Sequence, residues 1–195
     1  MTGAANAAVL TFENIGLNSS EDIPQTYGDL GNLDLTYQSR EAFGNSAPSY
    51  PYLLYWQDGY SDRTGVAYAP DTNVAEISFN AAPGYTGTIS TAYFGTYTSD
   101  VSGSFAIYDS AWNVLWSHTE SAIWDGGIGI SPAVSFTGIA YLQWGADWNL
   151  GLDELVYSVE PTGSQPAPVP LPAGLPLLGG GLLAFAGLRR SRKRG

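Results

Sequence analysis

The sequence predicts an all-β antiparallel sandwich of the jelly-roll type, followed by a single C-terminal transmembrane helix. Three observations support this fold class. Short segments in which apolar and polar residues alternate recur at intervals of roughly ten residues. Glycine accounts for 24 of the 195 residues and aromatic residues for 13%, a composition that suits short strands joined by tight turns. No segment with a helical period longer than about two turns precedes residue 171.

The candidate strands can be justified in chain order by their side-chain alternation. Residues 8–14 place Leu10 and Phe12 on one side of a strand, and residues 74–80 alternate with the same period of two. Residues 52–57 form an almost continuous apolar run, which is typical of a buried strand. The predicted strands are residues 8–14, 33–40, 52–57, 66–68, 74–80, 86–97, 102–108, 114–118, 133–136, 139–144 and 152–159. A series of this kind favours a sandwich with hairpin connections.

Charge and composition limit what the first 160 residues can bind. They are enough for one domain, which we assign to residues 8–160. All eighteen acidic residues precede the C-terminal tail, whereas only two cations, Arg40 and Arg63, do so, which leaves a formal charge near −16. Such a surface repels nucleic acid and anionic lipid. The sequence has no cysteine, which excludes disulfides, thiolate metal sites and a cysteine nucleophile.

The C-terminal tail has three parts. A proline-rich linker covers residues 161–170, and its prolines favour an extended, solvated chain. Residues 171–188 then form an uncharged apolar run of a length that, as a helix, covers roughly 27 Å. A buried helix of a globular domain is the alternative. The closing cations favour a membrane stop with the C-terminus in the cytoplasm; they are Arg189, Arg190, Arg192, Lys193 and Arg194.

The start of this tail resembles a known sorting signal. Val169, Pro170, Leu171, Pro172 and Ala173, followed by the apolar run and the arginines, are similar to the VPLPA variant of the PEP-CTERM sorting tails of Gram-negative bacteria. The resemblance covers about thirty residues. It implies recognition and cleavage by an exosortase, transient anchoring in the inner membrane, export to the cell envelope or the extracellular space, and a link with exopolysaccharide or biofilm production.

Export also leads to an expectation for the first residues. Residues 1–7 contain Ala5-Asn6-Ala7, which resembles the end of a cleaved signal peptide. We therefore interpret residues 1–7 as the remainder of a signal or processing region, and residues 169–195 as the sorting tail.

The evidence for catalysis in the sequence is weak. His118 is the only histidine and lies in a predicted strand, where a structural role is usual. Neither G-x-S-x-G nor H-E-x-x-H occurs. We therefore expect that the protein is not an enzyme. Glycoside hydrolysis requires only two carboxylates at a set separation, so a secreted glycan-active enzyme, a hydrolase or a lyase on the sandwich, stays open as the alternative.

A structural calcium site is predicted where the first and last strands meet. In a jelly roll the terminal strands commonly lie side by side, which would bring Glu13 near Asp153. The pattern F-E-N near the start with L-D-E-L near the end is similar to carbohydrate-binding-module sandwiches, and this resemblance implies that Glu13, Asn14 and Asp153 bind Ca²⁺ through oxygen ligands. The alternative is that they are solvated carboxylates at strand ends.

Aromatic residues supply a second candidate site. Sugar rings stack on Trp and Tyr through their C–H faces, while nearby polar side chains bond the hydroxyls. Trp112, in a predicted turn, and Trp124, Asp147 and Trp148, in polar loops, are the expected ligand-binding residues. Burial in the core is the alternative for each tryptophan. A further group lies around Gln57 and Asp58 and is expected to be mostly core: Tyr50, Tyr52, Tyr55, Trp56 and Tyr60. Together these features predict an exported, non-catalytic glycan-binding or structural protein whose partners are an exosortase, the inner membrane and a polysaccharide.

Overall fold

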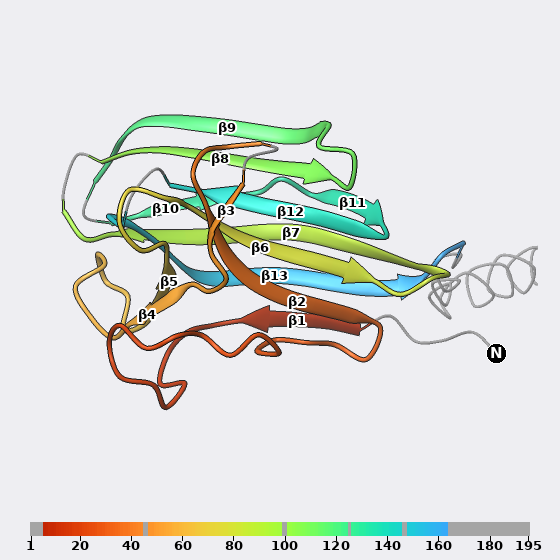
Figure 1. Cartoon of the computed structure of the whole chain (residues 1–195), viewed down its shortest axis with the longest axis horizontal. Coiled ribbons are helices and arrows are strands. Elements are labelled where there is room, and N and C mark those ends of the chain that lie inside the picture. The colour runs from red at the N-terminus through yellow and green to blue at the C-terminus, as the bar shows by residue number, and fades with distance from the viewer. Residues whose placement is uncertain (1–5, 45–46, 99–100, 125, 146–147, 164–195) are drawn as a thin grey trace, which may run out of the picture. The chain divides into compact units, whose positions relative to one another are not determined.

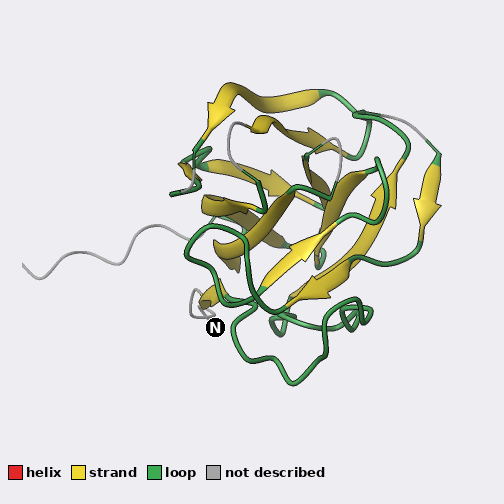
Figure 2. Ribbon diagram, turned by 90° about the vertical axis from the view of Figure 1, so that its left-hand side faces the viewer, coloured by secondary structure: helices red, strands yellow, loops and turns green. Residues whose placement is uncertain are grey.

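Two antiparallel β-sheets form the domain. The computed structural model describes residues 6–44, 47–98, 101–124, 126–145 and 148–163, and every regular element in these ranges is a strand (Figures 1 and 2). The first sheet has the order β10-β7-β13-β5-β4, with β1 on β13 and β11 on β7; the second has the order β3-β2-β6-β12-β8-β9. This confirms the predicted all-β antiparallel sandwich.

The strands have the following bounds. The first sheet contains β1 (Asn6–Leu10), β4 (Leu54–Trp56), β5 (Val66–Tyr68), β7 (Tyr85–Thr96), β10 (Ile128–Ile130), β11 (Val134–Thr137) and β13 (Leu150–Pro161). The second contains β2 (Leu33–Arg40), β3 (Pro48–Tyr50), β6 (Val74–Ala81), β8 (Val101–Asp109), β9 (Val114–Ile123) and β12 (Ile139–Trp144).

A single apolar core lies between the two sheets. It is filled by the alternating inward residues of both sheets, for example Phe79 of β6, Phe94 of β7 and Phe105 of β8. Trp144 is fully buried among them, and its indole N–H donates to the carbonyl oxygen of Leu150 at 3.3 Å. This hydrogen bond satisfies the indole N–H, so the ring can be buried in an apolar interior.

The structure contains a strand at each predicted segment, and three of them have the predicted bounds. β2, β5 and β12 begin and end at the predicted residues, and β9 and β13 extend beyond them. Two strands were not predicted, β3 and β10, because three residues that include Pro48 or Gly129 are too short to show a period. The first strand ends at Leu10 rather than at residue 14. Asn14 has a left-handed φ of 52°, which is incompatible with a strand that continues through it.

The first and last strands lie side by side, as predicted. β1 pairs antiparallel with β13, with Leu10 opposite Leu155 (Figure 1). Beyond the end of β1, the backbone N–H of Phe12 donates to Asp153 Oδ1 at 3.4 Å. This pairing brings Glu13, Asn14 and Asp153 into the same region of the domain.

The described part of the chain has no helix of the length and apolarity needed to cross a membrane. The linker from residue 164 onward, the motif Val169 to Ala173, the apolar run and the closing cations all lie outside the described residues, as do residues 1–5. The predictions made for them stay predictions.

Candidate functional site

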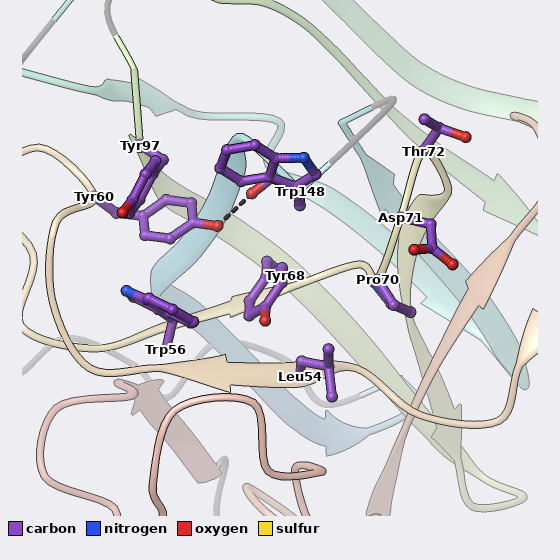
Figure 3. Close-up of a pocket in the computed structure, with 9 residues that line it drawn as sticks. All are labelled: Leu54, Trp56, Tyr60, Tyr68, Pro70, Asp71, Thr72, Tyr97 and Trp148. Carbon is purple, nitrogen blue, oxygen red and sulfur yellow. Dashed lines mark hydrogen bonds between the residues drawn. The ribbon is translucent and has the colours of Figure 1, made fainter.

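An aromatic cleft of about 690 Å³ opens beside the first sheet (Figure 3). We call it the aromatic cleft throughout. Its lining combines five aromatic rings with two polar side chains at one end; the lining residues are Leu54, Trp56, Tyr60, Tyr68, Pro70, Asp71, Thr72, Tyr97 and Trp148. In Figure 3 the rings gather at one end of the cleft, and Asp71 and Thr72 lie at the other.

The short β4–β5 hairpin forms one wall. Ala67 of β5 belongs to the core between the sheets, whereas Val66 and Tyr68 belong to a separate small cluster with Tyr60, against which Leu54 and Trp56 of β4 pack. β5 is therefore buried on both faces. One face contacts the core, and the other supports the cleft.

Two glycines allow the loop that carries Tyr60 to lie close to the sheet. A Cβ atom on Gly95 of β7 would lie 2.5 Å from the carbonyl oxygen of Tyr60, and one on Gly151 of β13 would lie 2.6 Å from Val66 and 3.0 Å from the Tyr60 ring. Real Cβ atoms do not approach other atoms to 2.5 Å, so a side chain at Gly95 would displace the Tyr60 backbone. The absence of side chains at these two positions lets Tyr60 reach the cleft.

The rings contact one another mostly edge to face. The centroids of Tyr60 and Tyr97 are 5.4 Å apart with an interplanar angle of 61°, and those of Tyr97 and Trp148 are 5.3 Å apart at 66°. Trp56 meets Tyr97 at 6.2 Å and 90°. Edge-to-face packing is the favoured arrangement of aromatic pairs, and it directs ring faces in several directions.

Two rings remain exposed despite these contacts. The relative exposure is 43% for Tyr97 and 40% for Trp148. Trp148 is held by its main chain, because its carbonyl oxygen accepts a hydrogen bond from the Tyr60 hydroxyl and its N–H donates to the carbonyl oxygen of Asp71 at 3.2 Å. The backbone is fixed while the indole stays accessible.

Asp71 lies in the turn that leads from β5 in one sheet to β6 in the other. Its φ of 55° is left-handed, and the turn is closed by hydrogen bonds from the main-chain and side-chain nitrogens of Asn73 to the carbonyl oxygen of Pro70. The Tyr50 hydroxyl of β3 donates to Asp71 Oδ2 at 2.9 Å, which raises the pKa of that phenol. Asp71 is exposed. It can accept hydrogen bonds or attract a positive charge at this end of the cleft.

One of the predicted calcium ligands, Asp153, is paired with an arginine. Asp153 is buried, and Arg63 donates from Nη1 to Asp153 Oδ2 at 3.1 Å. Burial raises the pKa of the Asp153 carboxyl, while the hydrogen bonds from Arg63 and from Phe12 N oppose that rise. Glu13 accepts a hydrogen bond from the Thr64 hydroxyl at 3.1 Å.

Arg63 already supplies the positive charge that this site needs. Its guanidinium also binds Asp62 at 2.6 Å and lies 4.4 Å from the centre of the Tyr93 ring. The described residues contain no group of three His, Cys, Asp or Glu side chains placed to hold a metal ion. Asp153 already has the Arg63 guanidinium as its partner, whereas calcium would require six or more oxygen ligands around one point. The calcium site stays a prediction.

Trp112 belongs to the second sheet and is not a lining residue of the cleft. It lies in the β8–β9 turn with φ of 64°, is half-buried rather than exposed, and stacks on Tyr141 of β12 with a centroid distance of 4.4 Å and an interplanar angle of 2°. The Arg40 guanidinium lies 4.7 Å from its ring centre. Tyr141 therefore covers one face of the Trp112 ring, and the ligand-binding role of Trp112 stays a prediction.

The other predicted residues are placed as follows. Trp148 lines the cleft; Trp124 is 65% exposed but is not one of the lining residues; Asp147 lies outside the described residues. His118 is in β9, as predicted, with its ring near those of Phe105 and Trp116. Its Nε2 lies 3.9 Å from Glu120, so its neighbours are aromatic rings and one carboxylate.

The comparisons with known proteins concern the fold alone. No family model matches the sequence, and no curated protein matches it. Among solved structures, the GH26-CBM35 β-(1,4)-mannanase of Podospora anserina is 11% identical, with a TM-score of 0.36 over 71% of this chain and 29% of that chain. A CBM4 structure is 11% identical, with a TM-score of 0.30 over 73% and 100% of the two chains. TmCBM61 in complex with β-1,4-galactotriose is 12% identical, with a TM-score of 0.27 over 69% and 91%.

Proposed function

We propose that the domain is a non-catalytic glycan-binding module on a jelly-roll sandwich and that the aromatic cleft is its binding site. One observation carries the proposal. The side chains of Tyr97 and Trp148 are exposed in a cleft of about 690 Å³ that carries a carboxylate, Asp71, at its other end. Cavities of roughly 300–1,000 Å³ with apolar walls and a few oriented polar groups are typical of small-ligand sites.

The chemistry of the lining matches that of a sugar ring. A pyranose has apolar C–H faces that stack on aromatic rings and hydroxyl groups that need polar partners at its edge. In the cleft, the exposed rings of Tyr97 and Trp148 supply stacking surfaces, and Asp71 with Thr72 supplies polar atoms at the other end. The main-chain hydrogen bonds of Trp148 hold its backbone in place before binding, which reduces the entropy lost when a ligand is bound.

Glycan binding is tested with the full chain in detergent on an array of bacterial and plant polysaccharides, followed by affinity measurements. We expect Trp148→Ala to raise Kd by about tenfold, which corresponds to a loss of about 1.4 kcal/mol in the binding free energy. Trp124→Ala is the matched control, because Trp124 is more exposed and is not a lining residue. Equal losses in both variants, or no binding to any glycan, would overturn the proposal. Release of sugar products that depends on one carboxylate would support the alternative, a glycan-active enzyme.

We also infer that an exosortase-type enzyme processes the protein and that the domain serves outside the cytoplasm in a polysaccharide matrix. Support comes from the motif Val169 to Ala173 with the apolar run and the closing cations. In cells that lack the processing enzyme, the full-length chain should accumulate in the inner membrane fraction. Full-length protein dissolved in the cytosol of normal cells would contradict the inference.

A further inference from the structure

We propose that the aromatic cleft selects saccharides that carry free amino groups over neutral saccharides, and that it rejects uronic acids. This inference rests on the proposed glycan-binding function and names its ligand class. It follows from the charge of the lining, from the positions of the two arginines of the domain, and from the electron-rich faces of the exposed rings.

The charge of the described lining is entirely negative. Asp71 is its one charged residue, and no Lys or Arg is among the lining residues. The Tyr50 hydroxyl donates to Oδ2 of Asp71, while Asp71 Oδ1 accepts none of the hydrogen bonds identified among the described residues. A carboxylate of this kind attracts an ammonium group and repels another carboxylate.

Both arginines of the domain have acidic partners, and neither arginine is a lining residue of the cleft. Arg40 binds Glu76 through Nε and Nη2, both at 2.9 Å, on the second sheet. Arg63 binds Asp62 and Asp153. The surrounding domain carries eighteen acidic residues. A uronate in the cleft would therefore meet a negative field with no cation in the described lining to balance it.

The aromatic rings add to the preference for a cation. The faces of Trp and Tyr rings are electron-rich and attract an ammonium group that lies within about 6 Å of the ring centre. Tyr97 and Trp148 are exposed, and Trp56 is half-buried at the same end of the cleft. An amino sugar can thus stack on one ring while its ammonium group meets another ring face or Asp71. An N-acetylated sugar lacks that charge.

The test compares three probes by calorimetry with the full chain at mildly acidic pH, where the amino group is protonated. The probes are short oligomers of β-1,4-linked glucosamine, their N-acetylated counterparts and oligogalacturonate. We expect the glucosamine oligomer to bind most tightly and to weaken at higher ionic strength. Asp71→Asn should reduce its advantage over the N-acetylated oligomer by about two- to fivefold. Asp34→Asn, which removes an exposed charge on β2, should leave that ratio unchanged.

The outcomes separate this inference from the function on which it rests. If Trp148→Ala abolishes binding but the N-acetylated oligomer or the uronate binds as tightly as the glucosamine oligomer, glycan binding holds and the amino-sugar preference is overturned. Equal effects of Asp71→Asn and Asp34→Asn also overturn it, since general surface charge would then explain the preference. If no saccharide binds, both proposals fail.

Discussion

Removing Arg40 should destabilise the domain strongly, because Arg40 is the buried partner of the buried Glu76 carboxylate. The Glu76 side chain is fully buried, and that of Arg40 is 9% exposed. Each oxygen of the Glu76 carboxylate accepts a hydrogen bond from Arg40, because Nε donates to Oε2 and Nη2 donates to Oε1, both at 2.9 Å. Arg40→Met would leave this carboxylate without a counter-ion on the outer face of the second sheet.

The magnitude follows from what remains around Glu76. Breaking one partner of a buried ion pair costs about 3–5 kcal/mol. Three neutral donors still reach the carboxylate, namely Gln38 Nε2, Gln143 Nε2 and the Ser78 hydroxyl. They offset part of the loss, so we expect a decrease near the lower limit, about 3 kcal/mol in the free energy of unfolding. For a domain of this size, that corresponds to a fall in Tm of about 6–12 °C.

Urea denaturation followed by tryptophan fluorescence measures the loss. Arg40→Lys keeps the charge but cannot form two parallel hydrogen bonds, so its loss should be intermediate. The double variant Arg40→Met/Glu76→Gln should be more stable than Arg40→Met alone, because the uncompensated charge is gone. Asp34→Asn is the control for removal of an exposed charge. A loss below about 1 kcal/mol for Arg40→Met, or strictly additive single changes, would refute this account of the pair.

Three further predictions concern the core, the cleft and the arginine site. Burial raises the pKa of Tyr157 to about 12, so the unfolded chain loses this proton at lower pH than the folded domain does. The free energy of unfolding should therefore fall as the pH rises above about 10. In Tyr157→Phe the decrease with pH should be shallower. Gly95→Ala should displace the Tyr60 backbone and weaken glycan binding more than tenfold, measured beside circular dichroism as a check on folding. If Glu13, Asn14 and Asp153 bind calcium, Ca²⁺ should raise Tm and a chelator should reverse that rise. The rise in Tm should be larger in Arg63→Met. No change in Tm in the wild type or in Arg63→Met would contradict the site.

The sandwich could be predicted from the sequence because buried and exposed side chains alternate along each strand with a period of two residues. The alternation of Ala75, Ile77 and Phe79 with Glu76 and Ser78 predicts which side of β6 contacts the core, and the structure places the first three in it. It does not predict that Glu76 is also fully buried. That burial depends on Arg40, Gln38 and Gln143 of the neighbouring strands. These side chains reach Glu76 because the strand register places Gln38 and Gln143 opposite it, and the register cannot be predicted from the sequence of one strand.

The aromatic cleft was harder to predict for a related reason. Its rings come from five separate segments. The polar loop of Trp148 predicts a ligand-binding residue, whereas the segments of Trp56 and Tyr68 resemble ordinary core. β5 shows this most clearly, because Val66, Ala67 and Tyr68 are all buried. A continuous apolar strand usually indicates layers of structure on both faces. Here the second layer is the small cluster of Tyr60, Val66 and Tyr68, with Leu54 and Trp56 packed against it, which also forms part of the cleft wall.

A more specific signal lies in the glycines of the strands beside that layer. Gly95 is the last residue but one of β7, Gly151 is the second residue of β13, and the two lie opposite each other in the sheet. Glycine weakens a strand and often marks a place where another backbone approaches closely. Both face the small cluster, and the atoms that a Cβ would meet belong to Tyr60, Val66 and Arg63. Glycines near the ends of two paired long strands, together with a short apolar strand that is buried on both faces, therefore indicate where a sandwich carries an additional layer. In this protein the exposed ring of Tyr97 packs against Tyr60 and Trp56 of that layer, and the ring of Trp148 packs against Tyr97.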